Sequence, residues 1–172
     1  MGNSRRRMLG AAIISVLTIL DAPGAHAQPC WRPPVAGVVA DPFREPPCRW
    51  CPGNRGLEYR IGADVDVRAA ASGTVAFAGD VAGVSYVVIE LPMGWRHTYG
   101  RLASIRVQPG DLVIAGTIIG RASSELFFGL RVGGVYRDPA PFLGTWSGQA
   151  RLVPVDGTDA RPSNRSIVRC NR

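Results

Sequence analysis

Two glutamates and one arginine are the side chains of this sequence whose types could support chemistry together. Glu58 follows the turn-forming Asn54-Arg55-Gly56, Arg101 lies near the end of an apolar run, and Glu125 begins another. If the fold brings them together, the two carboxylates could act as acid and base on a glycosidic bond. The alternative, which we favour, is that one or both glutamates balance the permanent charge of Arg101 in an ion-pair cluster.

The segments that must position these residues have the pattern of β-strands. From Val65 onward, short β-branched runs recur at intervals of roughly 8–12 residues between turn residues, and no stretch keeps a helical period. We expect strands at residues 73–78, 85–91, 95–102, 105–107, 112–114, 117–119, 126–132 and 135–137. Turns are expected at Gly79-Asp80, Gln108-Pro109-Gly110-Asp111 and Gly133-Gly134. The pattern predicts an all-β sandwich or barrel-like core with little helix.

The first 27 residues predict a secretory signal peptide. A basic start at Arg5-Arg6-Arg7 precedes an apolar run at residues 9–20 and the small residues Ala25-His26-Ala27. The apolar run is too short to span a bilayer core of about 30 Å. We therefore expect cleavage near Ala27 and a secreted or cell-envelope protein without a membrane span. Cleavage lowers the formal net charge from +7 to +5, because it removes three arginines and Asp21.

Composition divides the rest of the chain into a proline- and cysteine-rich segment at 28–53, a β domain at 54–144 and a basic, extended tail at 145–172. Proline excludes a helix from the first segment, where residues 35–40 could form an edge strand. The tail carries five arginines against two aspartates, so it could meet anionic wall polymers or simply be solvated. An exported chain without a stacking platform or a recognised motif is not expected to bind nucleic acid.

All four cysteines, Cys30, Cys48, Cys51 and Cys170, follow the expected leader. In an oxidising compartment an even number predicts two disulfides, and three connectivities are possible. We favour Cys30 with Cys170 and Cys48 with Cys51, although the sequence does not choose between the three. The spacing of Cys48 and Cys51 also matches a redox dithiol, but no βαβ pattern surrounds it. Structural zinc is less favoured, because only one pair has ligand spacing.

Six short motifs follow one another through residues 54–131. They are Asn54-x-Gly56-x-Glu58, residues 67–79, Tyr99-Gly100-Arg101-Leu102, and residues 107–111, 115–120 and 125–131. In order and spacing they resemble the lysostaphin-type, or LytM-like, peptidoglycan endopeptidases, metallopeptidase family twenty-three. In that family the first reads H-x-G-x-D, the third Y-x-H-L and the last H-L-H-F-E-V-R. The resemblance covers residues 35–144 and implies the family's β-sheet core, a duplicated hybrid motif.

The resemblance also implies a zinc site, but the residues at its positions lack the ligand chemistry. Asn54, Glu58 and Phe127 stand at the ligand positions, and Arg101 and Glu125 stand where the family has catalytic-site histidines. A phenyl ring has no lone pair, a neutral amide is a poor zinc ligand, and only Glu58 could still bind. A guanidinium about 4 Å from a dication adds a repulsion of roughly 8 kcal/mol at an effective dielectric near 20. We therefore expect that the family zinc is lost and that the chain has no cofactor.

Three further residues are candidates for contacts in the groove that the resemblance implies. By two-residue alternation His97 and Tyr99 share a strand face with Arg101, and Arg131 closes the last motif. His97 lies four residues from Arg101, about 13 Å along a strand, so it cannot replace a ligand beside Arg101. We expect His97 at the groove rim or on the surface, with ligand binding as the alternative.

These expectations favour an exported, non-catalytic LytM-like domain that acts at the cell wall. Its partner would be peptidoglycan, or a cell-wall hydrolase that it positions or activates. One alternative is an active zinc endopeptidase with other ligands. Another is a purely structural secreted module, braced by disulfides and held to the wall by its basic tail. The sequence leaves open the partner, the disulfide pairing, the oligomeric state and the choice between general secretory and twin-arginine export.

Overall fold

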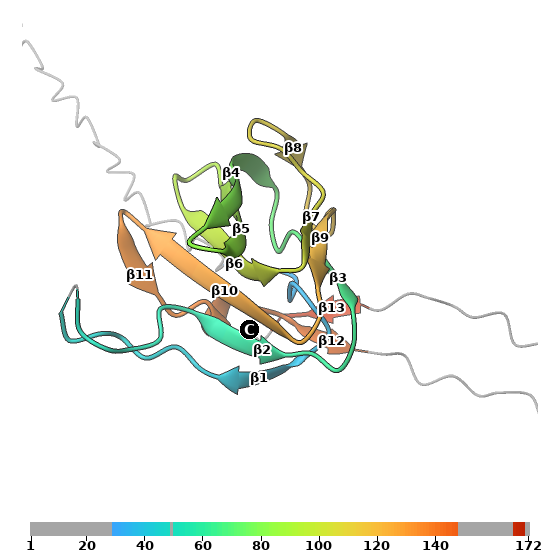
Figure 1. The fold of residues 1–172 in the computed structure, drawn as a ribbon. Coiled ribbons are helices and arrows are strands. Elements are labelled where there is room, and N and C mark those ends of the chain that lie inside the picture. The colour runs from blue at the N-terminus through green and yellow to red at the C-terminus, as the bar shows by residue number, and fades with distance from the viewer. Residues whose placement is uncertain (1–28, 49, 148–166, 171–172) are drawn as a thin grey trace, which may run out of the picture.

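The computed structural model describes residues 29–48, 50–147 and 167–170 (Figure 1). The expected signal peptide and the tail residues Arg151, Arg161 and Arg165 lie outside these ranges, so export stays a prediction. Within the described ranges, no helix is long and apolar enough to cross a membrane.

Eight antiparallel strands form the main sheet. Across the sheet they run in the order β1 (Val38–Asp41), β2 (Leu57–Arg60), β10 (Glu125–Val132), β6 (Arg96–Leu102), β5 (Val84–Glu90), β4 (Gly73–Val81) and β8 (Leu112–Val113). The eighth strand, β11 (Val135–Arg137), forms a hairpin with β10. β2 pairs with the first half of β10 and β11 with its end, so these two strands share one edge of β10.

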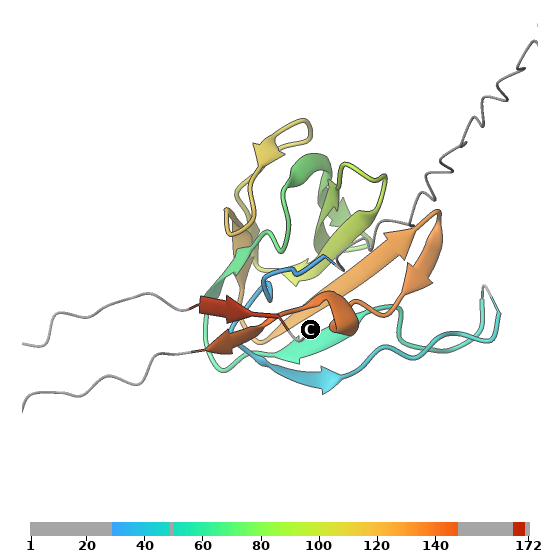
Figure 2. The same cartoon turned by 180° about the vertical axis from the view of Figure 1, so that it is seen from behind.

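Two smaller sheets complete the fold. One contains β3 (Val65–Arg68), β9 (Ile118–Ala122) and β7 (Ser104–Ile105), and the other pairs β12 (Thr145–Ser147) with β13 (Ile167–Arg169). The helical content of the described residues is one 3₁₀ turn, Ala140–Phe142. Seen from behind, β12, β13 and the first described residues lie across the back of the main sheet (Figure 2). The prediction of an all-β fold with little helix is confirmed.

The core lies on one face of the main sheet. Side chains of β2, β5, β6 and β10 form one cluster with those of β3 and β9 and with the N-terminal segment. Its largest fully buried members include Tyr99, Phe128, Ile89, Ile119, Leu126 and Leu130. The Tyr99 hydroxyl accepts a hydrogen bond from the backbone N–H of Ala70 at 2.8 Å, which ties β6 to the segment after β3. Burying each large apolar side chain contributes roughly 1.5–3 kcal/mol.

The hairpin of β4 and β5 is longer than the sequence predicted. Gly79 and Asp80 do not form a turn, because β4 continues through them, and the hairpin closes at Ala82-Gly83. Both of these residues have positive φ, 51° and 79°, as a type I′ turn requires. No residue of β4 after Val75 is buried, so apolar periodicity could not mark the end of this strand.

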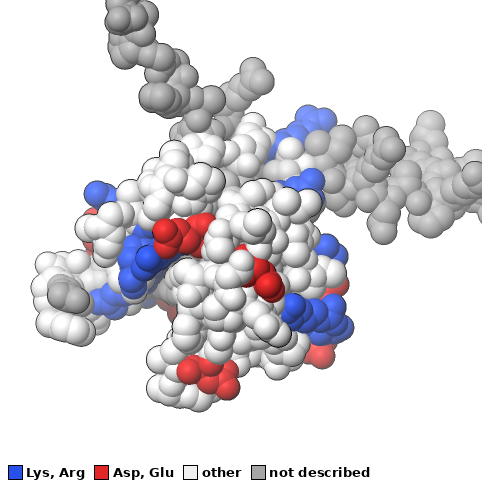
Figure 3. All heavy atoms as spheres, turned by 90° about the horizontal axis from the view of Figure 1, so that it is seen from above, with Lys and Arg blue, Asp and Glu red and all other residues white. Residues whose placement is uncertain are grey.

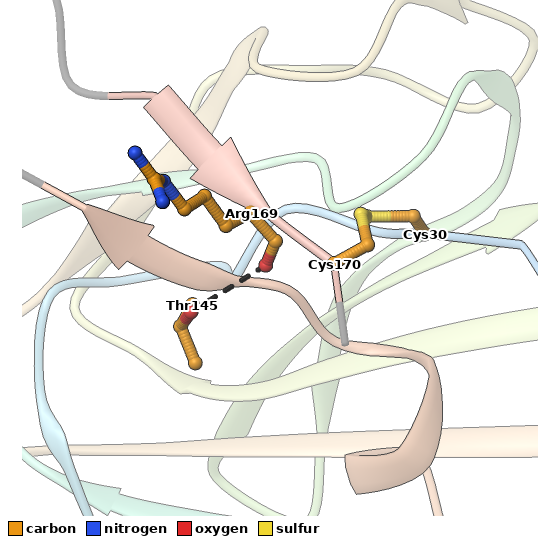
Figure 4. The surroundings of a disulfide bond; sticks show 4 residues. All are labelled: Cys30, Thr145, Arg169 and Cys170. Atoms are coloured by element: carbon orange, nitrogen blue, oxygen red, sulfur yellow. Dashed lines mark hydrogen bonds between the residues drawn. A yellow bond between two sulfur atoms is a disulfide. The ribbon is translucent and has the colours of Figure 1, made fainter. Parts of the chain in front are cut away.

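The two described parts of the segment after residue 144 are attached to the folded body and to each other. Residues 145–147 and 167–169 pair as β12 and β13, and Cys170 forms a disulfide with Cys30 (Figure 4). The Thr145 hydroxyl also donates to the carbonyl of Arg169 at 3.4 Å. The second disulfide joins Cys48 to Cys51, so the pairing is the one that we favoured among the three that the sequence left open.

His97 and Tyr99 lie in the core, so the prediction that His97 lies at the groove rim or on the surface is wrong, and neither side chain lines the groove. Both are 0% exposed, and neither ring nitrogen of His97 has a hydrogen-bond partner among the described residues. The ring centroids of Trp31, Phe128 and Tyr99 lie 4.2, 5.1 and 6.4 Å from that of His97, at interplanar angles of 66–79°. Simple alternation would place Arg101 on the same face as His97 and Tyr99, but a bulge turns Arg101 to the opposite face.

The buried imidazole should make the stability of the protein depend on pH. Burial lowers the pKa of His97 from 6.5 to about 3. Below pH 6.5 the unfolded chain takes up a proton that the folded chain does not, so stability is lost as the pH falls toward 3. By urea unfolding we expect a loss of about 3 kcal/mol between pH 7 and pH 4.5 from this group. His97→Leu should remove that part of the pH dependence, and an unchanged slope in the variant would contradict a neutral, buried His97.

Candidate functional site

The face of the main sheet opposite the core is hollowed into a groove of about 690 Å³. Its floor consists of the side chains of β10, β6 and β5 that alternate with the core residues, namely Phe127, Arg131, Arg96, Thr98, Tyr86 and Val88. Phe77 and Val81 of β4 flank one side, and Asn54, Arg55 and Glu58 flank the other. The groove therefore combines apolar side chains with several arginines.

Arg101 reaches the groove because of a β-bulge. The register of β5 against β6 shifts there, since Tyr86 pairs with Gly100 but Ser85 pairs with Leu102, which leaves Arg101 as an extra residue. The φ of Arg101 is 63°, a left-handed value that is uncommon outside glycine. Without the bulge, alternation would direct its side chain into the core.

The guanidinium of Arg101 binds two carboxylates. Its Nη2 and Nη1 donate to Oε1 and Oε2 of Glu58, both at 3.0 Å, and Nη1 also donates to Oε2 of Glu125 at 2.8 Å. Glu58 lies on β2 and Glu125 on β10, so the cluster joins three neighbouring strands. The prediction that the glutamates balance Arg101 in an ion-pair cluster is confirmed.

The cluster keeps Arg101 charged and in place, but it adds little to the free energy of unfolding. The hydrogen bonds accepted by Glu58, and then the charges of both carboxylates, raise the pKa of Arg101, so the guanidinium stays charged. The side chains of Arg101, Glu58 and Glu125 are 40%, 29% and 58% exposed, and water screens their attraction. Ion pairs with such exposure contribute only about 0–1 kcal/mol. The main result is a guanidinium held in place at this end of the groove, in a cluster whose one positive and two negative groups give a formal charge of −1.

The side-chain amide of Asn54 is hydrogen-bonded to the backbone. Its Nδ2 donates to the carbonyls of Asp41 and Pro42, both at 3.1 Å, and its Oδ1 accepts the backbone N–H of Gly56 at 3.3 Å. Its backbone forms an isolated antiparallel bridge with Arg44. These contacts fasten the end of β1 to the start of β2, so the amide has a structural role at a position where the resemblance implies a ligand.

Sequence reasoning found the polar part of the groove and missed most of its aromatic part. Asn54, Glu58, Arg101, Phe127 and Arg131 line the groove, and Glu125 is connected to it through Arg101. The missed residues are Phe77, Tyr86 and Tyr136.

Two signals could have revealed these aromatic residues. Tyr86 alternates with the core residue Val87, and a β-carbon at Gly100 would come within 2.5 Å of the Tyr86 ring. Glycine at that position therefore makes room for an aromatic side chain on the groove face. Tyr136 pairs with Arg131 across the hairpin that the sequence predicted.

Comparison with known proteins places the chain in a family. The profile of Peptidase family M23 matches residues 52–139, about half of the chain. The chain belongs to peptidase family M23. It is also 36% identical over 121 residues to uncharacterised proteins of Mycobacterium tuberculosis (Rv2891) and Mycobacterium bovis (Mb2915), which covers 67% of this chain and 47% of each relative. This M23 chain thus spans about half the length of the curated relatives it matches.

Solved structures show the same fold. Helicobacter pylori Csd3 is 25% identical with a TM-score of 0.60, and the match covers 72% of this chain and 35% of Csd3. A chain of the SpoIIQ–SpoIIIAH pore-forming complex is 23% identical with a TM-score of 0.59, over 68% of this chain and 92% of that one. The catalytic domain of lysostaphin, an antimicrobial peptidase of Staphylococcus simulans, is 23% identical with a TM-score of 0.51, over 59% and 88%.

The zinc that the family resemblance implies does not fit the residues of this M23 domain. Arg101 holds both carboxylate oxygens of Glu58, the Asn54 amide is hydrogen-bonded to the backbone, and Phe127 presents a ring. In the part of the chain that the structure describes, no three His, Cys, Asp or Glu side chains lie close enough to hold a metal ion. A cation here would displace the Arg101–Glu58 pair and meet a repulsion of about 4 kcal/mol per unit charge at about 4 Å.

Restoring the family pattern should create a zinc site. A variant with five substitutions should retain about one zinc per chain after exhaustive desalting, because it supplies imidazole and carboxylate ligands. The substitutions are Asn54→His, Glu58→Asp, Arg101→His, Glu125→His and Phe127→His. Atomic emission measures the metal. The matched variant with the other four changes but with Arg101 kept should bind zinc at least roughly tenfold more weakly, because the guanidinium repels the ion. Equal zinc affinity in the two variants would contradict this role of Arg101.

Proposed function

We propose that this chain is an exported, non-catalytic M23 domain that acts at the cell wall by binding. Its ligand is peptidoglycan, or a wall hydrolase that it positions or activates. The observation that carries the proposal is the bidentate contact between Arg101 and Glu58, which fills the position where the resemblance implies a metal and a catalytic-site histidine. Export rests on residues 1–27, whose sequence has the character of a signal peptide.

The groove has the properties of a binding site. Its volume of about 690 Å³ falls in the usual range for ligand pockets, about 300–1,000 Å³. Its side chains stand on paired strands, which limits the entropy lost when a ligand binds. Aromatic and arginine side chains also contribute most of the energy at many protein interfaces. A ligand held by such residues needs no metal to be retained.

The solved relatives fit a fold that serves more than one role. SpoIIQ assembles with SpoIIIAH in a pore-forming complex, whereas lysostaphin is a peptidase. The residues of this chain favour the first kind of role, because none of its expected ligand positions carries an imidazole. An active zinc endopeptidase would need ligands other than the residues that the structure brings together here.

Binding to the wall can be tested by co-sedimentation with purified peptidoglycan sacculi. We expect the protein to pellet with sacculi, to release no fragments and to carry no stoichiometric zinc. Phe77→Ala and Arg101→Ala should each weaken sedimentation roughly tenfold, because each removes a side chain from the groove. Leu112→Ala is the matched control, since Leu112 is an exposed apolar residue of β8 outside the groove. Arg101→Ala should change the unfolding free energy by no more than about 1 kcal/mol.

A tail variant separates groove binding from simple attachment by charge. Arg151→Gln, Arg161→Gln and Arg165→Gln neutralise the tail while keeping the Cys30–Cys170 disulfide. Loss of sedimentation in this variant, with both groove variants unaffected, would support the structural module instead. Capture of a wall hydrolase by the native protein but not by Phe77→Ala would select the protein partner. Cleavage of sacculi together with stoichiometric zinc would overturn the proposal.

A further inference from the structure

A second hollow lies next to the groove. It has a volume of about 880 Å³ and lies between the Cys48–Cys51 loop and the turn of the β10–β11 hairpin. Arg55, Arg131 and Tyr136 line both hollows, so the two meet at these residues. Figure 3 shows arginine side chains gathered in a depression on this face, with acidic side chains beside them. We call Arg55, Arg131 and Tyr136 the basic junction.

Two guanidinium groups pack on one aromatic ring in the basic junction. The Cζ atoms of Arg131 and Arg55 lie 4.7 and 5.8 Å from the ring centroid of Tyr136, within the range of cation–π attraction. Arg131 also donates Nη2 to the Tyr136 hydroxyl at 2.6 Å, and Arg55 donates Nη2 to the carbonyl of Cys51 at 3.3 Å. These contacts fix both side chains before any ligand arrives.

The charge of Arg131 has no acidic partner within the described ranges. No ion pair of 4.0 Å or less joins it to a described Asp or Glu, whereas Arg96, directly opposite on β6, pairs with Glu90 at 2.8 Å. An anion beside Arg131 and Arg55 would supply the counter-charge that Arg131 lacks and would accept charge-assisted hydrogen bonds, for which the planar guanidinium suits a carboxylate.

We propose that the basic junction binds the carboxylate of an extended peptide that lies along the groove. The inference rests on the proposed function, because it takes the groove as the binding site. Phe127 pairs with Gly100 next to the Arg101 cluster, and Arg131 pairs with Arg96 four residues further on. Four residues of strand span about 13 Å, so a peptide of about four residues reaches from one end to the other.

An extended peptide fits the groove better than a sugar acid does. The middle of the groove, between the Arg101 cluster and the basic junction, is lined by Phe127, Val88 and Phe77, with the hydroxyl groups of Thr98 and Tyr86 beside them. Most of this lining is apolar and matches amino-acid side chains, whereas a sugar ring would leave most of its hydroxyl groups without a hydrogen-bond partner. Beyond the junction, the second hollow leads to Trp50, which is 86% exposed.

The probes are acetylated tetra-alanine with a free C-terminal carboxylate, the same peptide as its C-terminal amide, and glucuronate, titrated into the protein by NMR at low salt. We expect the acid to bind roughly tenfold more tightly than the amide, because only the acid offers a charged acceptor. Arg131→Gln should bring the two affinities together. Arg137→Gln is the matched control and should leave the ratio of the two affinities unchanged. It removes one positive charge from the same hairpin, but Arg137 lines neither hollow.

Each other outcome would overturn the inference. The inference is contradicted if the protein binds the acid and the amide equally, or binds neither up to about 10 mM. It is also contradicted if Arg131→Gln keeps the preference for the acid, or if only glucuronate binds. If Arg131→Gln loses its native thermal transition, Tyr136→Phe decides instead, because it removes the hydroxyl that holds Arg131 and should reduce the preference. The protein could also sediment with sacculi and yet bind the acid and the amide equally. That result would refute this inference and leave the proposed function unaffected.

Discussion

The contact on which the groove depends is the bidentate pair between Arg101 and Glu58. It joins β6 to β2 across the strand that separates them, and Glu125 on that strand completes the cluster. The contact exists only because the backbone of Arg101 adopts a left-handed conformation at a bulge, which costs roughly 1–2 kcal/mol for a residue with a β-carbon. Its hydrogen bonds offset part of that cost. The structure thus spends stability on placing a permanent cation in a peptidase-type groove.

The division of the sheet into two faces explains why this cation need not disturb the fold. Along β10 the residues Leu126, Phe128 and Leu130 are buried, while Phe127 and Arg131, at alternating positions, face the groove. The core is complete on its own side, with aromatic and aliphatic residues from the main sheet, the β3–β9–β7 sheet and the N-terminal segment. Side chains on the groove face can therefore change their chemistry without leaving a cavity in the core. This separation is consistent with one scaffold occurring both in the peptidase lysostaphin and in the SpoIIQ–SpoIIIAH pore-forming complex.

Much of this organisation was visible in the sequence, because it depends on local rules. The apolar run predicted the strand at 126–132, and the Gly133-Gly134 turn predicted the last hairpin. The order of the six motifs located the groove and its polar residues.

The features that the sequence did not reveal depend on single departures from those rules. The bulge at Arg101 puts its side chain on the opposite face from the one that alternation predicts. The faces of His97 and Tyr99 therefore could not be assigned by counting residues back from Arg101. The length of β4 was hidden, because a strand exposed on both faces has no apolar period to read. The pairing of residues 145–147 with 167–169 was also missed, because no local pattern encodes a contact between segments so far apart in the chain, even though the Cys30–Cys170 bond beside it was favoured.

That bond has a consequence for the chain in a surrounding rich in proteases. Cys30 and Cys170 close nearly the whole folded part into a covalent ring, with their Cα atoms 5.8 Å apart. A single backbone cut anywhere inside the ring converts it into two pieces that remain attached, so neither piece can diffuse away. The two pieces of a nicked chain would separate on a gel only after a reductant breaks this disulfide. Only a second cut, or loss of the sulfur bridge, releases a fragment.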